Sequence, residues 1–466
     1  MSFIFYDVIF LVLFVIATVL FLYRRRNNLK REGIMYLYRT RVGIKFIEWA
    51  SKKFQNFLKA AQYLVVFVGL SLMISMIYLL IKFSYLYLTS PYIAKALKIP
   101  VIFPLVPYLP EIFKIDILPP FYFTYWIIII AIIAIPHEFA HGIFARLNKI
   151  KIHSTGFGFL GPFLAAFVEP DEKQTKKSSK FSQLSILGAG TFANILVAII
   201  FVLLLWGFFA LTFVPSGVNF NGYTSQIMNF SEISSVNGVP LSNLSSMNVS
   251  STELINISAN NKTYFLEPSN LKKSLDFNLT YTLVYEDSPA LKARLSSPII
   301  EIDGQKINSI EMLGNAILSH SPGDEIRVKA LKDNKEVEYN ITLGEKNGKP
   351  LFGIGFISYS RSGILGWFYS LVEKVKDPFI YYKSSIGDLG FFIFDLFWWI
   401  VMISLSVALV NMTPVGIFDG GRFFYLIVLA ITKKEKIAKK AFALSTWLIL
   451  LLVAAMMLKW LFAIVM

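Results

Sequence analysis

The chain has 466 residues, of which 55% are hydrophobic and only 16% are charged, and its formal net charge is +15. Soluble domains carry about 25% charged residues, so this composition excludes an ordinary soluble protein and indicates a membrane protein. The sequence contains no cysteine, which excludes disulfides, cysteine-ligated zinc and thiol nucleophiles. The positive charge alone is compatible with two partners, nucleic acid and an anionic membrane surface.

Six segments are long and apolar enough to cross a bilayer, which takes about 20 residues. The first, residues 3–23, is apolar except for Asp7 and stops at three arginines. It lacks a small-residue cleavage site, so we expect a retained anchor rather than a signal peptide. The other predicted spans are 63–88, 121–147, 184–213, 390–410 and 441–465.

Basic residues are concentrated in three of the segments between spans. Segment 24–61 holds eleven basic and two acidic residues, segment 146–183 holds seven and three, and segment 420–440 holds six and one. Because Lys and Arg mark cytoplasmic loops, the sequence predicts a multi-pass protein of the cell membrane with these segments in the cytoplasm. The positive charge is then a topology signal, and we expect membrane lipid and no nucleic acid as a partner.

Residues 215–362 differ from the rest of the chain, because they are polar, rich in Asn and Ser, and nearly neutral in charge. Alternating runs that begin at Glu325 and Val337 predict strands. A strand followed by an Asn-Gly or Asp-Gly turn occurs near Ile233 and again near Ile300. The second copy and its flanks resemble a PDZ domain, which binds peptide by adding a strand to its sheet. We therefore expect an extracytoplasmic, β-rich, PDZ-like domain of one or two units, with peptide or substrate tails as partners.

The same segment contains seven Asn-x-Ser/Thr sequons. An Asn- and Ser-rich chain produces sequons by chance, but their density on the side assigned to the outside favours a glycoprotein. The seven are Asn229, Asn243, Asn248, Asn256, Asn261, Asn278 and Asn340.

The third span ends in residues that can carry chemistry. His137 and His141 stand four residues apart, with Glu138 beside the first. Two histidines at this spacing lie on one side of a helix and can bind one zinc ion, and the glutamate is placed to act as a general base. Ionisable residues in a span cost about 2.5–3.5 kcal/mol each on insertion scales and mark function more often than packing. The alternative is three polar residues that line a helix contact.

A catalytic zinc needs a third protein ligand. His153 lies nearby in a loop, whereas His320 lies in the domain assigned to the other side of the membrane. Asp419 follows the fifth span and returns to the cytoplasmic depth of His137, and Pro414 and the glycine pair after Asp419 permit broken backbone there. Asp419 is therefore the expected third ligand.

These residues resemble the site-2 protease family, the zinc metalloproteases that cleave within membranes. The run from His137 to His141 is similar to the family's zinc motif, and Asp419 with its two glycines is similar to the third ligand. The run from Gly190 to Asn194 is similar to a glycine-to-asparagine element, in which the resemblance implies that Asn194 positions substrate or stabilises an oxyanion.

The chain departs from the family pattern in its prolines, which are absent where Thr191, Gly416 and Ile417 stand. The resemblance covers residues 121–214 and 387–432 and the inserted domain. It implies that single-pass transmembrane proteins are cleaved in regulated intramembrane proteolysis, with Zn2+ as the cofactor and Glu138 and Asn194 as catalytic residues. It also implies that a β-hairpin at residues 156–168 pairs with the unwound substrate.

The sequence thus predicts a polytopic α-helical membrane protein of about six transmembrane helices with an inserted extracytoplasmic PDZ-like domain. Two other functions stay open: a catalytically inactive membrane scaffold that binds peptides, and a divalent-metal transporter, although the half-repeats typical of carriers are not visible. The expected parts are 1–120 with two accessory spans, 121–214 with the first part of the catalytic core, 215–362 with the PDZ-like domain, 363–432 with the rest of the core, and 433–466 with a basic loop and the last span.

Overall fold

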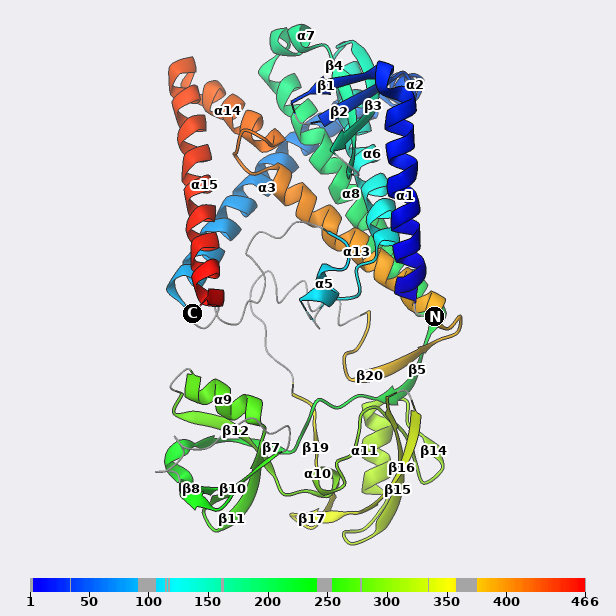
Figure 1. The fold of residues 1–466 in the computed structure, drawn as a ribbon, viewed down its shortest axis with the longest axis vertical. Coiled ribbons are helices and arrows are strands. Elements are labelled where there is room, and N and C mark those ends of the chain that lie inside the picture. Colours follow the sequence, from blue (N-terminus) through cyan, green and yellow to red (C-terminus); the bar gives the residue numbers. More distant parts are fainter. Residues whose placement is uncertain are drawn as a thin grey trace. The chain divides into compact units, whose positions relative to one another are not determined.

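The computed structural model describes residues 3–33, 35–90, 106–113, 115, 118–160, 163–240, 254–276, 279–333, 335–357 and 375–465. The chain forms two compact units (Figure 1). The helical unit comprises Met1–Leu205 and Phe392–Met466, and the inserted unit comprises Trp206–Phe391. The domain boundaries expected near residues 215 and 362 stay predictions, and the second of them falls within residues 358–374, outside the described residues.

Six helices in the described part of the chain are long and apolar enough to cross a membrane, as the sequence predicts. Their mean hydropathy over the best window lies between 2.0 and 2.8. Large apolar side chains stay exposed along them, for example Leu13, Leu203 and Leu451, which lipid tolerates and water does not. The six are α1 (Phe3–Arg25), α3 (Gln55–Thr89), α6 (Phe123–Leu147), α8 (Lys180–Thr212), α13 (Asp388–Asn411) and α15 (Glu435–Val465).

Helix α6 packs against α1, α2 and α3, among other elements of the helical unit. The buried face at its start, with Tyr125 and Ile129, packs against Ile400 and Ile403 of α13. The buried residues at its end pack against Ile47 of α2 and against α8. Five shorter helical elements complete the helical unit: η1 (Arg26–Asn28), α2 (Ile44–Lys53), α5 (Leu109–Ile112), α7 (Glu172–Lys177) and α14 (Asp419–Thr432).

Asp7, the one acid in α1, is buried and caps the start of α6. Its carboxylate accepts hydrogen bonds from the backbone N–H groups of Phe123 and Thr124, from the Thr124 hydroxyl and from the Tyr108 hydroxyl. The first N–H groups of a helix have no partner within it, and a negative charge there is favourable. Asp7 therefore fixes α1 to the helix that carries the histidines.

The helical unit also contains a four-stranded antiparallel sheet in the order β1-β2-β3-β4. The hairpin of β3 and β4 occupies the segment in which the sequence predicts one, whereas β1 and β2 come from the basic segment after α1 and were not predicted. At Gly156 a Cβ atom would lie 2.1 Å from the Tyr38 carbonyl oxygen, so only glycine lets β2 approach β3. The strands are β1 (Leu29–Glu32), β2 (Met35–Thr40), β3 (Ile152–Leu160) and β4 (Phe163–Pro170).

An ion pair joins β2 to β4 across this sheet. The Arg39 guanidinium contacts both carboxylate oxygens of Glu169, with Nε 3.0 Å from Oε2. The hydrogen bonds from Arg39 and Ser154 hold the pKa of Glu169 below its ordinary value of 4.5. The pair therefore helps to hold three strands in register at neutral pH.

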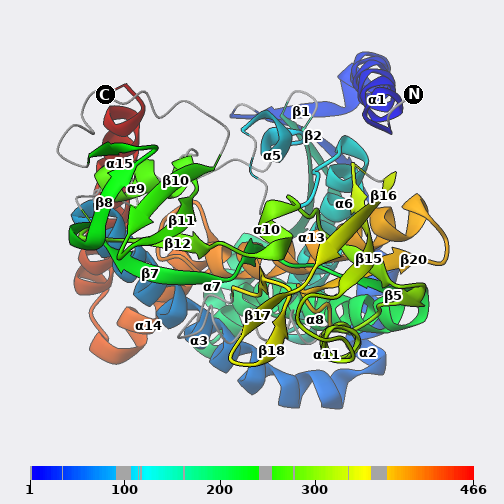
Figure 2. The ribbon, with the colours of Figure 1, turned by 90° about the horizontal axis from the view of Figure 1, so that it is seen from below.

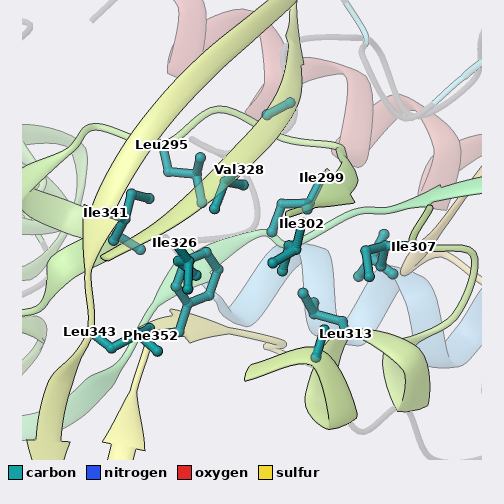
Figure 3. Packing of buried hydrophobic residues seen from close by; sticks show 14 of the residues in the cluster. Leu295, Ile299, Ile302, Ile307, Leu313, Ile326, Val328, Ile341, Leu343 and Phe352 are labelled. Atoms are coloured by element: carbon teal, nitrogen blue, oxygen red, sulfur yellow. The ribbon is translucent and has the colours of Figure 1, made fainter. Parts of the chain in front are cut away.

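The inserted unit consists of two lobes that lie beside each other in Figures 1 and 2. One lobe has a six-stranded sheet, β7-β12-β11-β10-β8-β9, with α9. The other is built on the sheet β16-β15-β13-β5-β20, with β14 paired to β13. Figure 3 shows the core of this second lobe, in which Ile302, Ile326 and Val328 are completely or almost completely buried.

The two lobes repeat one local arrangement. In each, a tight hairpin (β8–β9 or β13–β14) pairs through its first strand with the first strand of a longer hairpin (β10–β11 or β15–β16). Both tight turns, Asn237-Gly238 and Asp303-Gly304, have positive φ at both residues, as two-residue hairpins require. The two sequence copies are therefore equivalent hairpins. Whether either lobe is a PDZ domain is left as a prediction.

The elements of the inserted unit are β5 (Phe213–Val218), β6 (Gly222–Tyr223), β7 (Ser225–Asn229), η2 (Phe230–Glu232), β8 (Ile233–Val236), β9 (Val239–Pro240), β10 (Ile255–Ala259), β11 (Lys262–Leu266), α9 (Pro268–Asp276), β12 (Tyr281–Glu286), α10 (Pro289–Lys292), β13 (Ile299–Ile302), β14 (Gln305–Lys306), α11 (Ile310–Leu318), β15 (Glu325–Lys332), β16 (Lys335–Thr342), β17 (Gly344–Lys346), β18 (Lys349–Leu351), β19 (Ile354–Gly355) and β20 (Ile380–Ser384).

Candidate metal centre

Three predicted ligands, His137 and His141 of α6 and Asp419 of α14, lie together in the helical unit. The two Nε2 atoms are 3.1 Å apart, and Asp419 Oδ2 lies 3.6 Å from Nε2 of His137 and 3.3 Å from Nε2 of His141. Ligand atoms at about 2.1 Å from a tetrahedral zinc are roughly 3.4 Å from one another. The spacing of these three atoms therefore fits a zinc ion.

The other ring nitrogen of each histidine is held by α8. His141 Nδ1 lies 2.7 Å from the Ile186 carbonyl oxygen, which can only accept, so Nδ1 carries the proton and Nε2 keeps its lone pair for a metal. His137 Nδ1 lies 3.1 Å from the side-chain amide of Asn194. Asn194 is fully buried, and its Oδ1 has no hydrogen-bond partner.

The orientation of the Asn194 amide follows from the requirements of a metal ligand. If His137 binds a metal through Nε2, its Nδ1 must donate a hydrogen bond. Rotation of the amide about χ2 exchanges nitrogen and oxygen, so that Oδ1 accepts the hydrogen bond from Nδ1–H and is no longer an unpaired buried acceptor. The buried contact of Asn194 is thus with a ligand, whereas its predicted role toward substrate remains a prediction.

Gly190 makes room for the histidines on the face of α8 that contacts them. A Cβ atom there would lie 2.4 Å from His141 Nε2 and 2.6 Å from His137 Nε2. Both distances are shorter than any real Cβ contact, so a side chain at this position would displace the ligands. Both residues of the predicted glycine-to-asparagine element thus contact the ligands: Gly190 leaves room for the two imidazoles, and Asn194 contacts His137.

Asp419 is the first residue of α14, and the glycine pair after it lies in the first helical turn. A Cβ at Gly420 would lie 2.3 Å from the Met412 carbonyl carbon, and one at Gly421 would lie 2.3 Å from the Val415 carbonyl oxygen. The sequence predicts broken backbone at Pro414 and at the glycine pair. The chain is non-helical over residues 412–418, which include Pro414, but the prediction was wrong for the two glycines. They are helical, and they let α14 approach the chain that follows α13.

The ionisation of Asp419 suits a metal ligand. With no metal bound and His141 protonated, burial acts to raise the pKa of Asp419, but the charge of His141 and the hydrogen bonds from both histidines outweigh it. The pKa of Asp419 therefore lies well below its ordinary value, and the residue offers a carboxylate at neutral pH.

Glu138, the expected general base, contacts strand β4 of the sheet. Its Oε2 accepts a hydrogen bond of 3.0 Å from the backbone N–H of Val168 in β4. Glu138, His141 and Asp419 line one cavity of about 860 Å3, together with Ala166 and other residues of β4. The base, two of the three ligands and the edge of the sheet therefore share one cavity.

The two remaining histidines lie outside this cluster. His153 pairs with Asp171 at 3.1 Å, and His320 pairs with Asp303 at 3.1 Å. Among the described residues, the group of His137, His141 and Asp419 is the one that brings three metal-ligating side chains together. Spacing and charge in the sequence pointed to these three residues. The Ile186 carbonyl and the Val168 N–H are backbone groups, so the identity of their side chains gives no sign of their roles.

Residues 125–455 match the model of Peptidase family M50. The match covers well over half of the chain. The chain belongs to peptidase family M50. This is the site-2 protease family of membrane metalloproteases, so the family indicated by the sequence motifs is confirmed, and the M50 match together with six apolar helices makes the chain a multi-pass membrane protein.

M50 peptidases use zinc, and the ligand spacing and donor set described above fit that ion. This M50 peptidase is also similar to an uncharacterised protein of Methanocaldococcus jannaschii. The two are 27% identical over 350 residues, which is 73% of this chain and 72% of the other protein.

Proposed function

We propose that this M50 peptidase is a zinc-dependent endopeptidase that hydrolyses peptide bonds in the transmembrane segments of single-pass proteins, as a step in regulated intramembrane proteolysis. The observation that carries the proposal is the position of the site. Two of the three ligands and Glu138 lie on α6, a helix with the length and hydropathy of a membrane span. Ligands placed on such a helix suit a substrate that is itself apolar and embedded.

His137, His141 and Asp419 would hold the zinc ion, with Asn194 and the Ile186 carbonyl fixing the two imidazoles. When bound, zinc activates water and polarises the scissile carbonyl. Glu138 lies beside the ligands in the same cavity and is placed to accept a proton from the attacking water and to deliver it to the leaving amine. Arg422, one helical turn after Asp419, also lines this cavity and is a charged group available to the substrate.

A transmembrane helix hides its carbonyl groups in hydrogen bonds, so the substrate must unwind before it is cut. In our proposal the unwound stretch pairs with the outer edge of β4. One edge of the β3–β4 hairpin is occupied by β2, and within the described residues no strand pairs with the other edge. That second edge borders the cavity of the metal ligands.

The side of the membrane on which each part lies also belongs to the proposal. The three basic segments suggest that the metal centre is toward the cytoplasm and that the inserted unit is extracytoplasmic. Four predicted sequon asparagines, Asn229, Asn256, Asn261 and Asn340, are exposed, as glycosylation requires. Asn243, Asn248 and Asn278 lie outside the described residues.

The PDZ-like lobes are proposed to bind peptide or substrate tails at their sheet edges. Binding of tail peptides to the full-length protein, followed by fluorescence anisotropy, tests this role. An anisotropy that stays constant at every peptide concentration would contradict it.

Membrane lipid is a further proposed partner, and α2 provides the contact. Phe46 and Trp49 are about half exposed on this short helix, and Lys53 lies 5.0 Å from the Trp49 ring centre. An aromatic face flanked by lysines is typical of helices that lie in the headgroup region of anionic bilayers. Quenching of Trp fluorescence by headgroup-labelled anionic lipid, lost in Trp49→Ala, checks this contact.

The proposed function is tested with purified protein, zinc analysis and a synthetic single-span peptide. Wild type should bind one zinc per chain and cut the peptide. Glu138→Gln should keep the zinc and lose hydrolysis by about 10^2- to 10^4-fold, the usual contribution of a general base. His141→Ala should lose both.

The open alternatives give different results in the same experiment. A wild type that binds zinc but leaves the peptide intact supports the inactive scaffold, and one that also moves metal across liposomes supports the transporter. Either outcome contradicts the proposed peptidase.

A further inference from the structure

One contact shows which backbone N–H groups of β4 point away from β3. Val168 stands opposite Thr155 of β3, yet its N–H donates to Glu138 on the other side. In two antiparallel strands, opposite residues alternate. One pair exchanges backbone hydrogen bonds, and in the next pair the backbone N–H and C=O groups point away from the partner strand, that is, outward. Val168 belongs to the outward set, and so do Ala166 and Leu164, which stand opposite Phe157 and Phe159.

The last outward-pointing N–H group of β4 lies next to Glu138, beside the metal ligands. The next outward position after Val168 is Pro170, which has no N–H to donate. Val168 therefore carries the last outward donor of β4, and this donor is the one that contacts Glu138, 3.0 Å away. A strand paired with this edge would present its last hydrogen-bonded carbonyl at the position now held by the Glu138 carboxylate.

We propose that the Val168 N–H is a donor shared between Glu138 and the substrate. In the free protein it holds Glu138, and on binding, a substrate carbonyl takes it and releases Glu138 beside the peptide bond to be cut. Val168 is thus a positioning residue that sets the register of the substrate strand and thereby the bond that is hydrolysed. The inference rests on the proposed function, since it assigns a cut site to that reaction.

Site-resolved hydrogen–deuterium exchange tests the shared donor without hydrolysis. In Glu138→Ala, exchange at the Val168 amide should accelerate roughly fivefold, the effect of losing about one hydrogen bond. Exchange at Ala166, an outward donor without a Glu138 contact, should stay as in wild type. Adding a synthetic single-span peptide to Glu138→Ala should slow exchange at both amides.

Cut-site mapping by mass spectrometry tests the register. Val168→Pro removes the shared donor, and Ala166→Pro removes a neighbouring outward donor. Both changes spare the hydrogen bonds to β3, because proline is tolerated where the N–H of an edge strand points outward. Val168→Pro should spread the cuts over adjacent bonds, whereas Ala166→Pro should lower kcat/KM by roughly fivefold and keep the wild-type bond.

Two controls separate this effect from misfolding. Val168→Ala keeps the N–H and should cut at the wild-type bond, and Val168→Pro should bind as much zinc as wild type. A Val168→Pro protein that keeps its zinc and still cuts at the single wild-type bond would overturn the proposal. So would an unchanged exchange rate at Val168 in Glu138→Ala.

The experiments distinguish an error in the shared-donor proposal from an error in the proposed peptidase function. If wild type never hydrolyses the peptide but Glu138→Ala shows both exchange effects, the result contradicts the peptidase and supports the shared donor. If wild type hydrolyses the peptide but Glu138→Ala shows neither exchange effect, the result contradicts only the shared donor.

Discussion

The side chain at position 190 can be no larger than the hydrogen atom of glycine. The two histidines of α6 lie so close to this position of α8 that a methyl group would overlap both Nε2 atoms. The metal centre therefore depends on a residue that contributes no ligand, and the requirement is steric rather than chemical.

Gly190→Ala should weaken zinc binding, because the added methyl group displaces both imidazoles from their positions. We expect at least a tenfold loss of zinc affinity, measured by competition with a metal-binding dye. Gly207→Ala is the matched control, since Gly207 lies on the same helix with no atom within 4 Å of its Cβ position. That control should bind zinc as wild type does and unfold at a slightly higher temperature, because alanine favours a helix over glycine by about 1 kcal/mol. Equal zinc affinity in the two variants would contradict the steric argument.

Among the helices, the contact between α1 and α6 depends on a single carboxylate. Asp7 is 2% exposed and accepts from two backbone N–H groups at the start of α6. Buried donors that lose their acceptor cost about 1–3 kcal/mol each. A change at the far end of α6 therefore affects the helix that holds the ligands.

Asp7→Ala should lower the unfolding temperature in detergent, because it leaves the N–H groups of Phe123 and Thr124 without their acceptor. Asp7→Asn keeps an acceptor oxygen and should recover much of the loss. Calorimetry of the two variants beside wild type measures this. If the alanine variant unfolded at the wild-type temperature, α1 would be a passive anchor.

The elements and contacts that the sequence predicts are those with a local signal. The helical spacing of His137 and His141 and the apolar length of the spans lie within single segments. The role of Asp7 depends on residues 116 positions later, and the pairing of Tyr36 with Phe159 joins β2 to a strand beyond the next two spans. The sequence shows Asp7 only as an acid in a span and β2 only as part of a basic segment, because nothing local marks the distant partner.

Over the whole molecule, the absence of cysteine allows the proposed orientation to be tested directly. Single cysteines at exposed positions, Lys173→Cys and Lys436→Cys in basic segments and Lys262→Cys in the inserted unit, should be labelled from opposite sides. A membrane-impermeant maleimide should label Lys262→Cys in intact cells and the other two only after permeabilisation. The reverse pattern would invert the orientation, and labelling of all three in intact cells would rule it out.

The order of the ligands along the chain has a consequence for biosynthesis. His137 and His141 are translated before the inserted unit and Asp419 after it. A nascent chain therefore carries two of the three ligands throughout the synthesis of Trp206–Phe391, too few for a catalytic zinc. The centre is completed only when α14 emerges from the ribosome, so a chain that stops early, for any reason, is proteolytically inert.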